Sequence, residues 1–239
     1  MTTEGDSLPR LGFVKLSGVI SGYHRRRESM NFSVPQAEQK NLAIVAVGAA
    51  LTSLSGASVP DEAENEEEAD HVFFFINGET IRGWVWRSPF KNGDEVEVVA
   101  EWQADHYEAF AIARPCDRTV ALYPHCSRGR ASHFKNAMFW FAMIMLFQVG
   151  LTTAVLLSFA DMSILSEPAY YLSIAGLAAF FGLMVISLAR KWSPYVEVAE
   201  KVFTTFEWPN PSWVDLVKSS KAQRTAKDKA EFGAFYFRY

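Results

Sequence analysis

Cysteine is scarce in this chain of 239 residues, because only Cys116 and Cys126 occur. Two cysteines cannot build a disulfide framework, and this low count suits a reducing compartment. Residues 1–30 lack a basic start followed by a long apolar core, so we expect no cleavable signal peptide. The net charge is −4. Without an excess of positive charge, the sequence does not predict a nucleic-acid partner.

Catalytic motifs are also missing: there is no glycine-rich phosphate loop, no nucleophile elbow and no paired-carboxylate pattern. The pairs Asp105-His106 and His125-Cys126 are the only hints of acid–base or nucleophilic groups. Adjacency in sequence does not assemble a nucleophile, a base and an orienting group. Asp105 falls in a predicted hairpin turn, where aspartate is common for local hydrogen-bonding reasons. We therefore predict no catalytic residue and no enzyme activity.

Two cysteines and a histidine near residue 120 could in principle bind a metal ion. Cys116, His125 and Cys126 would need a fourth ligand, either His106 or His133. Their spacing does not fit the paired-ligand knuckles of zinc sites. The simpler interpretation is two small buried thiols near a strand end and a polar loop. We predict no metal and no cofactor.

Two long uncharged runs dominate the second half of the chain, at residues 136–160 and 168–189. Each exceeds the roughly 20 residues that a helix needs to cross a hydrocarbon core about 30 Å thick. The connection DMSILSE is short enough only for a tight turn. The runs predict a transmembrane helical hairpin over residues 136–189, with two buried helices of a soluble domain as the alternative.

The charges beside these runs predict their orientation. Basic residues flank the outer ends of the pair: Arg128, Arg130, Lys135, Arg190 and Lys191. The connecting loop holds Asp161 and Glu167 and no basic residue. Positive flanks stay on the cytoplasmic side, so we expect a multi-pass protein of the bacterial inner membrane with both termini in the cytoplasm. Neither run has an ionisable residue near its middle, which argues against a proton relay or ion site.

Residues 71–123 alternate in the manner of strands. Asn77-Gly78 is the strongest short hairpin signal, because both positions of such a turn need positive φ. Within DEVEVVAEW, one face is predicted to point to a core: Val96, Val98, Ala100 and Trp102. Residues 11–23 and 28–34 supply two further candidate strands. We predict an α+β membrane protein whose small antiparallel β domain, a barrel or a sandwich, combines residues 1–34 and 71–127 on the cytoplasmic side.

Residues 35–70 separate the two halves of this β domain. Residues 41–59 carry no charge, and seven of the ten residues 61–70 are acidic. If residues 41–59 crossed the membrane, the two halves of the β domain would lie on opposite sides and could not pair. We therefore predict an inserted hydrophobic helix on the cytoplasmic side, followed by a solvated acidic linker. A full crossing stays open as the alternative, because about 19 residues are near the lower limit for a span.

The C-terminal segment, residues 190–239, begins with an amphipathic helix over residues 195–206. A basic stretch follows at residues 218–229, and the chain ends in FGAFYFRY. Such an aromatic tail docks on its own β domain, on the membrane interface or on a partner. The early cluster Arg25-Arg26-Arg27 is either a solvated loop or a contact with anionic lipid.

Several phrases of the sequence together carry a family resemblance. They are SPFKNGDEVEVVAEW, YEAFAIARPCDRTVALYPHCSRGR, the two-span hairpin, WPNP and the terminal FYFRY. The chain resembles proteobacterial two-span membrane proteins labelled as type VI secretion system effectors. The resemblance implies an association with contact-dependent delivery into rival cells, that is, interbacterial competition, and it implies no reaction.

Three kinds of function follow from these expectations. The first is a non-enzymatic membrane-active effector, a toxin that inserts and oligomerises in the membrane. The alternative is a resident inner-membrane immunity or accessory protein whose β domain binds a toxin or a secretion component. The third is an enzyme whose site the sequence does not show. The expected partners are the lipid bilayer, a secretion-system or cognate effector or immunity protein, and further copies of the chain, with no nucleic acid.

Overall fold

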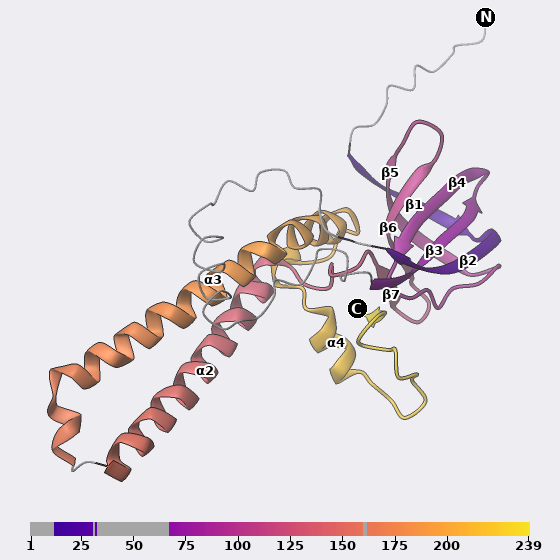
Figure 1. Cartoon of the computed structure of the whole chain (residues 1–239). Coiled ribbons are helices and arrows are strands. Elements are labelled where there is room, and N and C mark those ends of the chain that lie inside the picture. The colour runs from indigo at the N-terminus through magenta and orange to yellow at the C-terminus, as the bar shows by residue number, and fades with distance from the viewer. Residues whose placement is uncertain (1–11, 31, 33–66, 160–161) are drawn as a thin grey trace, which may run out of the picture. The chain divides into compact units, whose positions relative to one another are not determined.

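The computed structural model describes residues 12–30, 32, 67–159 and 162–239, and everything below refers to them (Figure 1). The chain divides into two compact units. One unit holds the chain up to Gly129 and again from Pro194 to Tyr239, and the other is Arg130–Ser193. The chain is an α+β protein with a mixed sheet of 8 strands and two long apolar helices.

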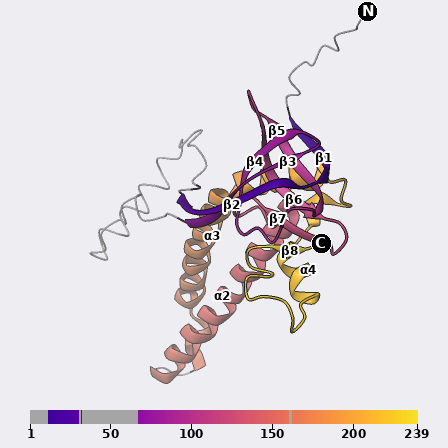
Figure 2. The same cartoon turned by 90° about the vertical axis from the view of Figure 1, so that its right-hand side faces the viewer.

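The first unit is built on the sheet. Its strands are β1 (Phe13–Val19), β2 (Ser21–Met30), β3 (Glu67–Ile76), β4 (Glu79–Val85), β5 (Glu95–Trp102), β6 (Tyr107–Arg114), β7 (Thr119–Leu122) and β8 (Phe237–Arg238). The main path runs in the order β1-β5-β6-β4-β3-β2. Only Ile20 separates β1 from β2 along the chain, so the two ends of the path meet and the sheet closes into a barrel (Figure 2).

One pair in this barrel is parallel. β4 and β6 run side by side in the same direction at Gly83 and Ala109, whereas the other strand pairs are antiparallel. The prediction of a purely antiparallel domain is therefore wrong at this pair. Gly83 permits the pairing, because a Cβ there would clash with the carbonyl oxygen of Ala109. With β1 and β2 counted as one bent strand, the path is a Greek-key barrel of the OB type, a likeness of architecture alone.

The hairpin between β3 and β4 forms as the sequence predicts. Asn77 and Gly78 have φ values of 52° and 88°, which a two-residue turn of this kind requires. On β5, Val98 has no exposed surface, but Trp102 is 36% exposed, so the prediction that Trp102 faces the core is wrong. The register of β5 on β6 shifts between Val99 and Ala100, and this irregularity breaks the simple alternation before Trp102.

The barrel interior is the main hydrophobic core. Its buried members come from strands β3 to β7, from the junction of β1 and β2, and from the segment between β4 and β5: Ile20, Val72, Phe74, Ile76, Ile81, Val85, Phe90, Val96, Val98, Ala100, Ala109, Ile112 and Ala121. Leu16 of β1 and Tyr23 of β2 are partly buried and pack against this core. The β domain therefore holds a core large enough to fold around, and strands from both sides of residues 35–66 contribute to it.

Two C-terminal elements complete this unit. The last part of α3 (Pro168–Thr205) buries the apolar face predicted for residues 195–206, including Val196, Val202 and Phe203. Beyond it lie η3 (Pro211–Trp213) and α4 (Leu216–Ala222). β8 then pairs with β7, and Phe237 is 1% exposed. Of the three docking places considered for the aromatic tail, the structure selects its own β domain.

Two boundary predictions need correction. β3 begins at Glu67, so residues 67–70 belong to a strand and not to the predicted linker. β2 spans Ser21–Met30, so the basic cluster at residues 25–27 lies in a strand and not in a solvated loop, and the strand expected at residues 28–34 starts earlier. The inserted hydrophobic helix and the rest of the acidic stretch, residues 35–66, lie outside the described residues.

The second unit contains the two apolar helices, α2 (Arg130–Phe159) and the membrane-length part of α3, with the short helix η2 (Met162–Ser166) between them. Both extend beyond the predicted spans at residues 136–160 and 168–189. The Thr153 hydroxyl of α2 and the Tyr170 hydroxyl of α3 share a hydrogen bond of 2.7 Å. Both helices are long and apolar enough to cross a membrane, and within the described part of the chain the apolar stretch of neither is buried.

Candidate functional site

Asp70 is the one charged residue that the described structure buries completely. It lies on β3, at the end of the acidic run. Removing a carboxylate from water is costly unless hydrogen bonds and opposite charges replace the lost hydration. The side chains around Asp70 must therefore supply hydrogen bonds and positive charge.

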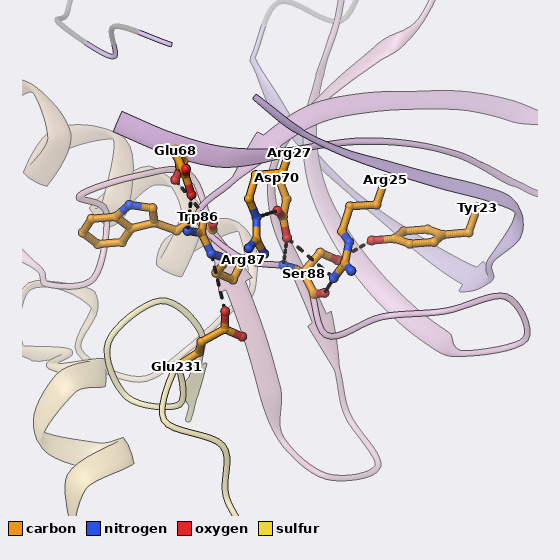
Figure 3. Close-up of polar contacts among 9 residues, drawn as sticks. All are labelled: Tyr23, Arg25, Arg27, Glu68, Asp70, Trp86, Arg87, Ser88 and Glu231. Carbon is orange, nitrogen blue, oxygen red and sulfur yellow. Dashed lines mark hydrogen bonds and ion pairs between the residues drawn. The ribbon is translucent and has the colours of Figure 1, made fainter. Parts of the chain in front are cut away.

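Three groups satisfy this carboxylate (Figure 3). Arg27 Nε donates a hydrogen bond to Asp70 Oδ1 at 3.0 Å. The backbone N–H of Ser88 donates to Oδ2 at 2.9 Å. Arg25 Nη1 lies 3.7 Å from the same Oδ2 and also donates to the Ser88 carbonyl at 2.8 Å. Asp70 is thus held by two cations and one backbone donor.

Strand geometry explains how β2 places both arginine side chains beside Asp70. Side chains two residues apart point to the same face of a strand, so Arg25 and Arg27 share a face. In the register of β2 on β3, Arg27 pairs directly with Asp70. The arginine side chains remain 47% and 44% exposed, so their outer surfaces keep contact with water. The network therefore joins a fully buried anion to the surface.

Tyr23 closes one end of the network. Its hydroxyl shares a hydrogen bond with the Ser88 side chain (Figure 3). Burial raises the pKa of Tyr23 above its ordinary value. Tyr23 therefore stays a neutral phenol near neutral pH, and it serves as a hydrogen-bond partner, not as a base.

Arg87 forms a second cluster next to the first. Its guanidinium donates to the carbonyl oxygens of Glu68 and Trp86 at 2.7 Å and 2.8 Å. It also lies 3.3 Å from the Glu68 carboxylate, 3.6 Å from that of Glu231, and 5.0 Å from the centre of the Phe235 ring. Arg87 thus connects the end of β4 to the C-terminal tail.

These two clusters have the chemistry of a structural clamp. The carboxylate of Asp70 has its hydrogen-bond donors and cations within the protein, from β2 and from Ser88. The hydroxyls of Tyr23 and Ser88 are hydrogen-bonded to each other. The clamp fixes β2 to β3 through Asp70, and it joins the tail to β3 through Arg87. In the sequence, only the basic cluster and the acidic run indicated it, as two separate features.

The pair Asp105-His106 does form a contact. His106 Nδ1 lies 2.7 Å from Asp105 Oδ1, and its Nε2 lies 3.5 Å from Glu108 Oε2. The hydrogen bond with His106 lowers the pKa of Asp105, and burial raises the pKa of Glu108. The sequence analysis missed Glu108. His106 and Glu108 are two positions apart, and in an extended chain this spacing puts two side chains on the same face. The cluster links the β5–β6 turn to β6.

The residues considered as metal ligands near the cysteines lie in different surroundings. His125 Nε2 pairs with Glu67 Oε2 at 2.8 Å, and its ring packs edge-to-face against Trp86. Cys126 is buried, and burial raises the pKa of its thiol, so it stays protonated. Cys116 is exposed, so the expectation of a buried thiol is wrong there. In the described part of the chain, no three His, Cys, Asp or Glu side chains gather in a way that could hold a metal ion.

The remaining candidate is the apolar helix pair itself. Large apolar side chains stand outward from both helices: Leu146 at 71%, Phe147 at 71%, Leu172 at 75% and Leu183 at 63% exposed. Exposed apolar surface on this scale is unstable in water and favourable in hydrocarbon. The arrangement is therefore suited to an apolar surrounding.

Comparison with known proteins adds no family to these observations. The sequence matches no protein-family model, no curated protein and no solved structure.

Proposed function

We propose that this chain is a bacterial inner-membrane protein that anchors a folded β domain at the cytoplasmic face of the bilayer. The observation that carries the proposal is the pair α2 and α3, whose apolar stretches are long enough to span a membrane and are not buried among the described residues. Helices that are apolar on every side require a core or a membrane.

The proposed orientation rests on the charges at the helix ends. Arg130 and Lys135 lie at the start of α2, and Arg190 and Lys191 follow the apolar part of α3. Basic residues near span ends remain on the cytoplasmic side. The first unit follows directly from these ends of the helices, so it belongs in the cytoplasm.

As its role, we propose a resident accessory or immunity protein whose β domain binds a toxin or a component of the secretion machinery. The helix pair supports this role, because residues 136–159 and 168–189 carry no charged side chain that could line a water-filled path. The structural clamp around Asp70 supports it too, since it holds the strands of the β domain together.

A membrane-active effector of the type VI secretion system is the second candidate. The resemblance of the sequence to proteins with that label favours it, as does the exposed apolar surface of α2 and α3. Two helices cannot enclose a pore, so this role requires several copies in the membrane. The protein would then act without enzyme chemistry.

Topology reporters test the membrane placement. Fusions after Tyr239 and between Asn31 and Ser33 should both report the cytoplasm, and a reporter at Ser163 should report the periplasm. Opposite locations for the first two would contradict the placement of the β domain. Location of all three in the soluble fraction would contradict the membrane proposal.

Expression in a sensitive bacterium distinguishes the two roles. A resident protein should leave growth and membrane potential unchanged and should protect cells from a neighbour that carries the cognate toxin. Collapse of the membrane potential by this chain alone would replace the resident role with the effector role.

A further inference from the structure

The segment around η3 and α4 contains an exposed tryptophan and a run of exposed cations. Trp213 is 62% exposed. Five exposed basic residues follow within twelve positions: Lys218, Lys221, Arg224, Lys227 and Lys229. Asp215 and Asp228 are the acidic residues in this stretch, so its charge is positive although the net charge of the chain is −4.

Both acidic residues in the stretch are already engaged. Asp215 caps α4 by accepting from the Lys218 backbone N–H at 2.9 Å, and it pairs with Arg128 at 3.3 Å. Asp228 accepts from the Thr225 backbone and pairs with Arg238. Within the described residues, none of the five basic side chains has an acidic partner. Their positive charge is therefore available to an external anion.

The fold holds this segment firmly. Leu216 and Ser220 lie on the buried side of α4, and Ser220 Oγ accepts from the Arg238 backbone N–H at 2.8 Å. α4 is thereby attached to β8, beside the C-terminus (Figure 1). Lys218 and Lys221 occupy exposed positions of the same helix. The cations are presented from a fixed surface and not from a loose tail.

The segment is also tied to the residue that precedes the first apolar helix. The Gly129 N–H donates to the Val214 carbonyl at 3.0 Å, and the Leu216 N–H donates to the Ser127 carbonyl at 3.1 Å. A Cβ on Gly129 would clash with backbone atoms of Pro211 and Ser212. α2 begins at the next residue, Arg130. Trp213 and the start of α4 are therefore held beside residues 127–129, which precede α2 in the chain.

We infer that the surface formed by Trp213 and the five basic residues 218–229, the basic platform, binds the anionic lipid headgroups of the cytoplasmic leaflet. Tryptophan favours the interface between water and lipid, and lysine and arginine are attracted to anionic headgroups within a Debye length of about 8 Å. Each cation near such a surface strengthens the attraction about fivefold. This inference rests on the proposed membrane placement, and it specifies the lipid that the β domain contacts.

Hydrogen exchange of the full-length protein in nanodiscs tests the inference. Nanodiscs of neutral phosphatidylcholine are compared with nanodiscs that also contain anionic phosphatidylglycerol. Amides of residues 211–229 should exchange at least about fivefold more slowly in the anionic nanodiscs, and raised salt should remove the difference. Equal exchange in the two lipids, or an effect that salt does not change, would overturn the inference.

Two matched variants give the control. Lys221→Gln, Arg224→Gln and Lys227→Gln together should abolish the dependence on lipid charge. Arg26→Gln, Lys91→Gln and Lys201→Gln remove the same charge from exposed positions elsewhere in this unit and should leave the dependence intact. If both variants lost the dependence on lipid charge equally, the dependence would reflect the total charge of the protein. That result would contradict a binding site at the basic platform.

Two further results separate this inference from the proposed function. If carbonate extracts the wild-type protein from membranes, the membrane placement and the basic platform both fail. If the protein stays in the membrane but shows no dependence on lipid charge, only the platform fails. Protection of the same amides by a soluble DNA duplex in neutral nanodiscs would assign the surface to a soluble polyanion and overturn the lipid inference.

Discussion

Arg27 Nε and Asp70 Oδ1 lie 3.0 Å apart across β2 and β3, with the carboxylate fully buried and the guanidinium partly exposed. This contact joins residues from the two sides of residues 33–66, a segment outside the described part of the chain. It gives the basic cluster a definite role, because a strand register that pairs Arg27 with Asp70 also aligns the neighbouring residues of β2 and β3.

The first prediction concerns this buried carboxylate. Asp70→Asn keeps the shape but removes the charge that receives hydrogen bonds from Arg27 and Ser88, so it should lower the free energy of unfolding by about 1.5–3 kcal/mol. Thermal unfolding of the detergent-solubilised protein measures the change. Glu68→Gln is the control, because its side chain is 62% exposed and its pair with Arg87 contributes at most about 1 kcal/mol. Equal effects of both substitutions would mean that the network does not stabilise the barrel.

The second prediction compares two positions of one strand. Val98→Asp places a charge in the barrel interior and should prevent folding, because no partner replaces its hydration. Trp102→Asp should fold and lose about 1 kcal/mol from the ring contact with Tyr107. Circular dichroism and expression yield report the outcome. If Trp102→Asp also abolished folding, Trp102 would have to be a core residue, contrary to its exposure in the structure.

The third prediction concerns the aromatic tail. Phe237→Ala should cost about 3–5 kcal/mol, since the ring is 1% exposed and belongs to the strand that pairs with β7. Lys229→Ala, on an exposed position nearby, should leave the unfolding temperature unchanged. A tail that tolerates Phe237→Ala would be a separate docking peptide and not part of the domain.

The fourth prediction uses the two thiols. A maleimide should label Cys116 in the folded protein and spare Cys126, and both should react in guanidinium. Mass spectrometry counts the labels, and Cys116→Ser should remove the native one. Rapid native labelling at Cys126 would contradict its burial.

The fifth prediction concerns alkaline pH. Burial raises the pKa of the Cys126 thiol and raises that of Tyr123 to about 12, so the unfolded chain releases these protons at lower pH than the folded one. Stability should be constant from neutral pH to the ordinary thiol pKa of about 8.5 and then fall as pH rises. Cys126 alone contributes a slope of about 1.4 kcal/mol per pH unit there. Cys126→Ala should make the decline shallower, and an unchanged profile would show that the thiol titrates normally in the fold.

The helix pair and most strands of the barrel could be predicted from local pattern, with β2 as the exception. Uncharged runs of membrane length specify helices by hydropathy alone, and Asn77-Gly78 specifies its hairpin through the positive φ that both positions adopt. The apolar face of residues 195–206 likewise follows from helical periodicity. These features depend on neighbours in sequence, which is why sequence reasoning reached them.

What only the tertiary structure decided depends on contacts between distant residues. The sequence gives no sign that β4 runs parallel to β6, since that pairing relies on Gly83 lying against Ala109. The acidic run also does not predict that its last residue, Asp70, is buried. Burial of Asp70 depends on the contact with Arg27 of β2, which is distant in sequence. The placement of Phe237 on β7 is of the same kind. Burial of a charge and pairing of strands depend on which distant segments come into contact. Those contacts exist only in the folded chain.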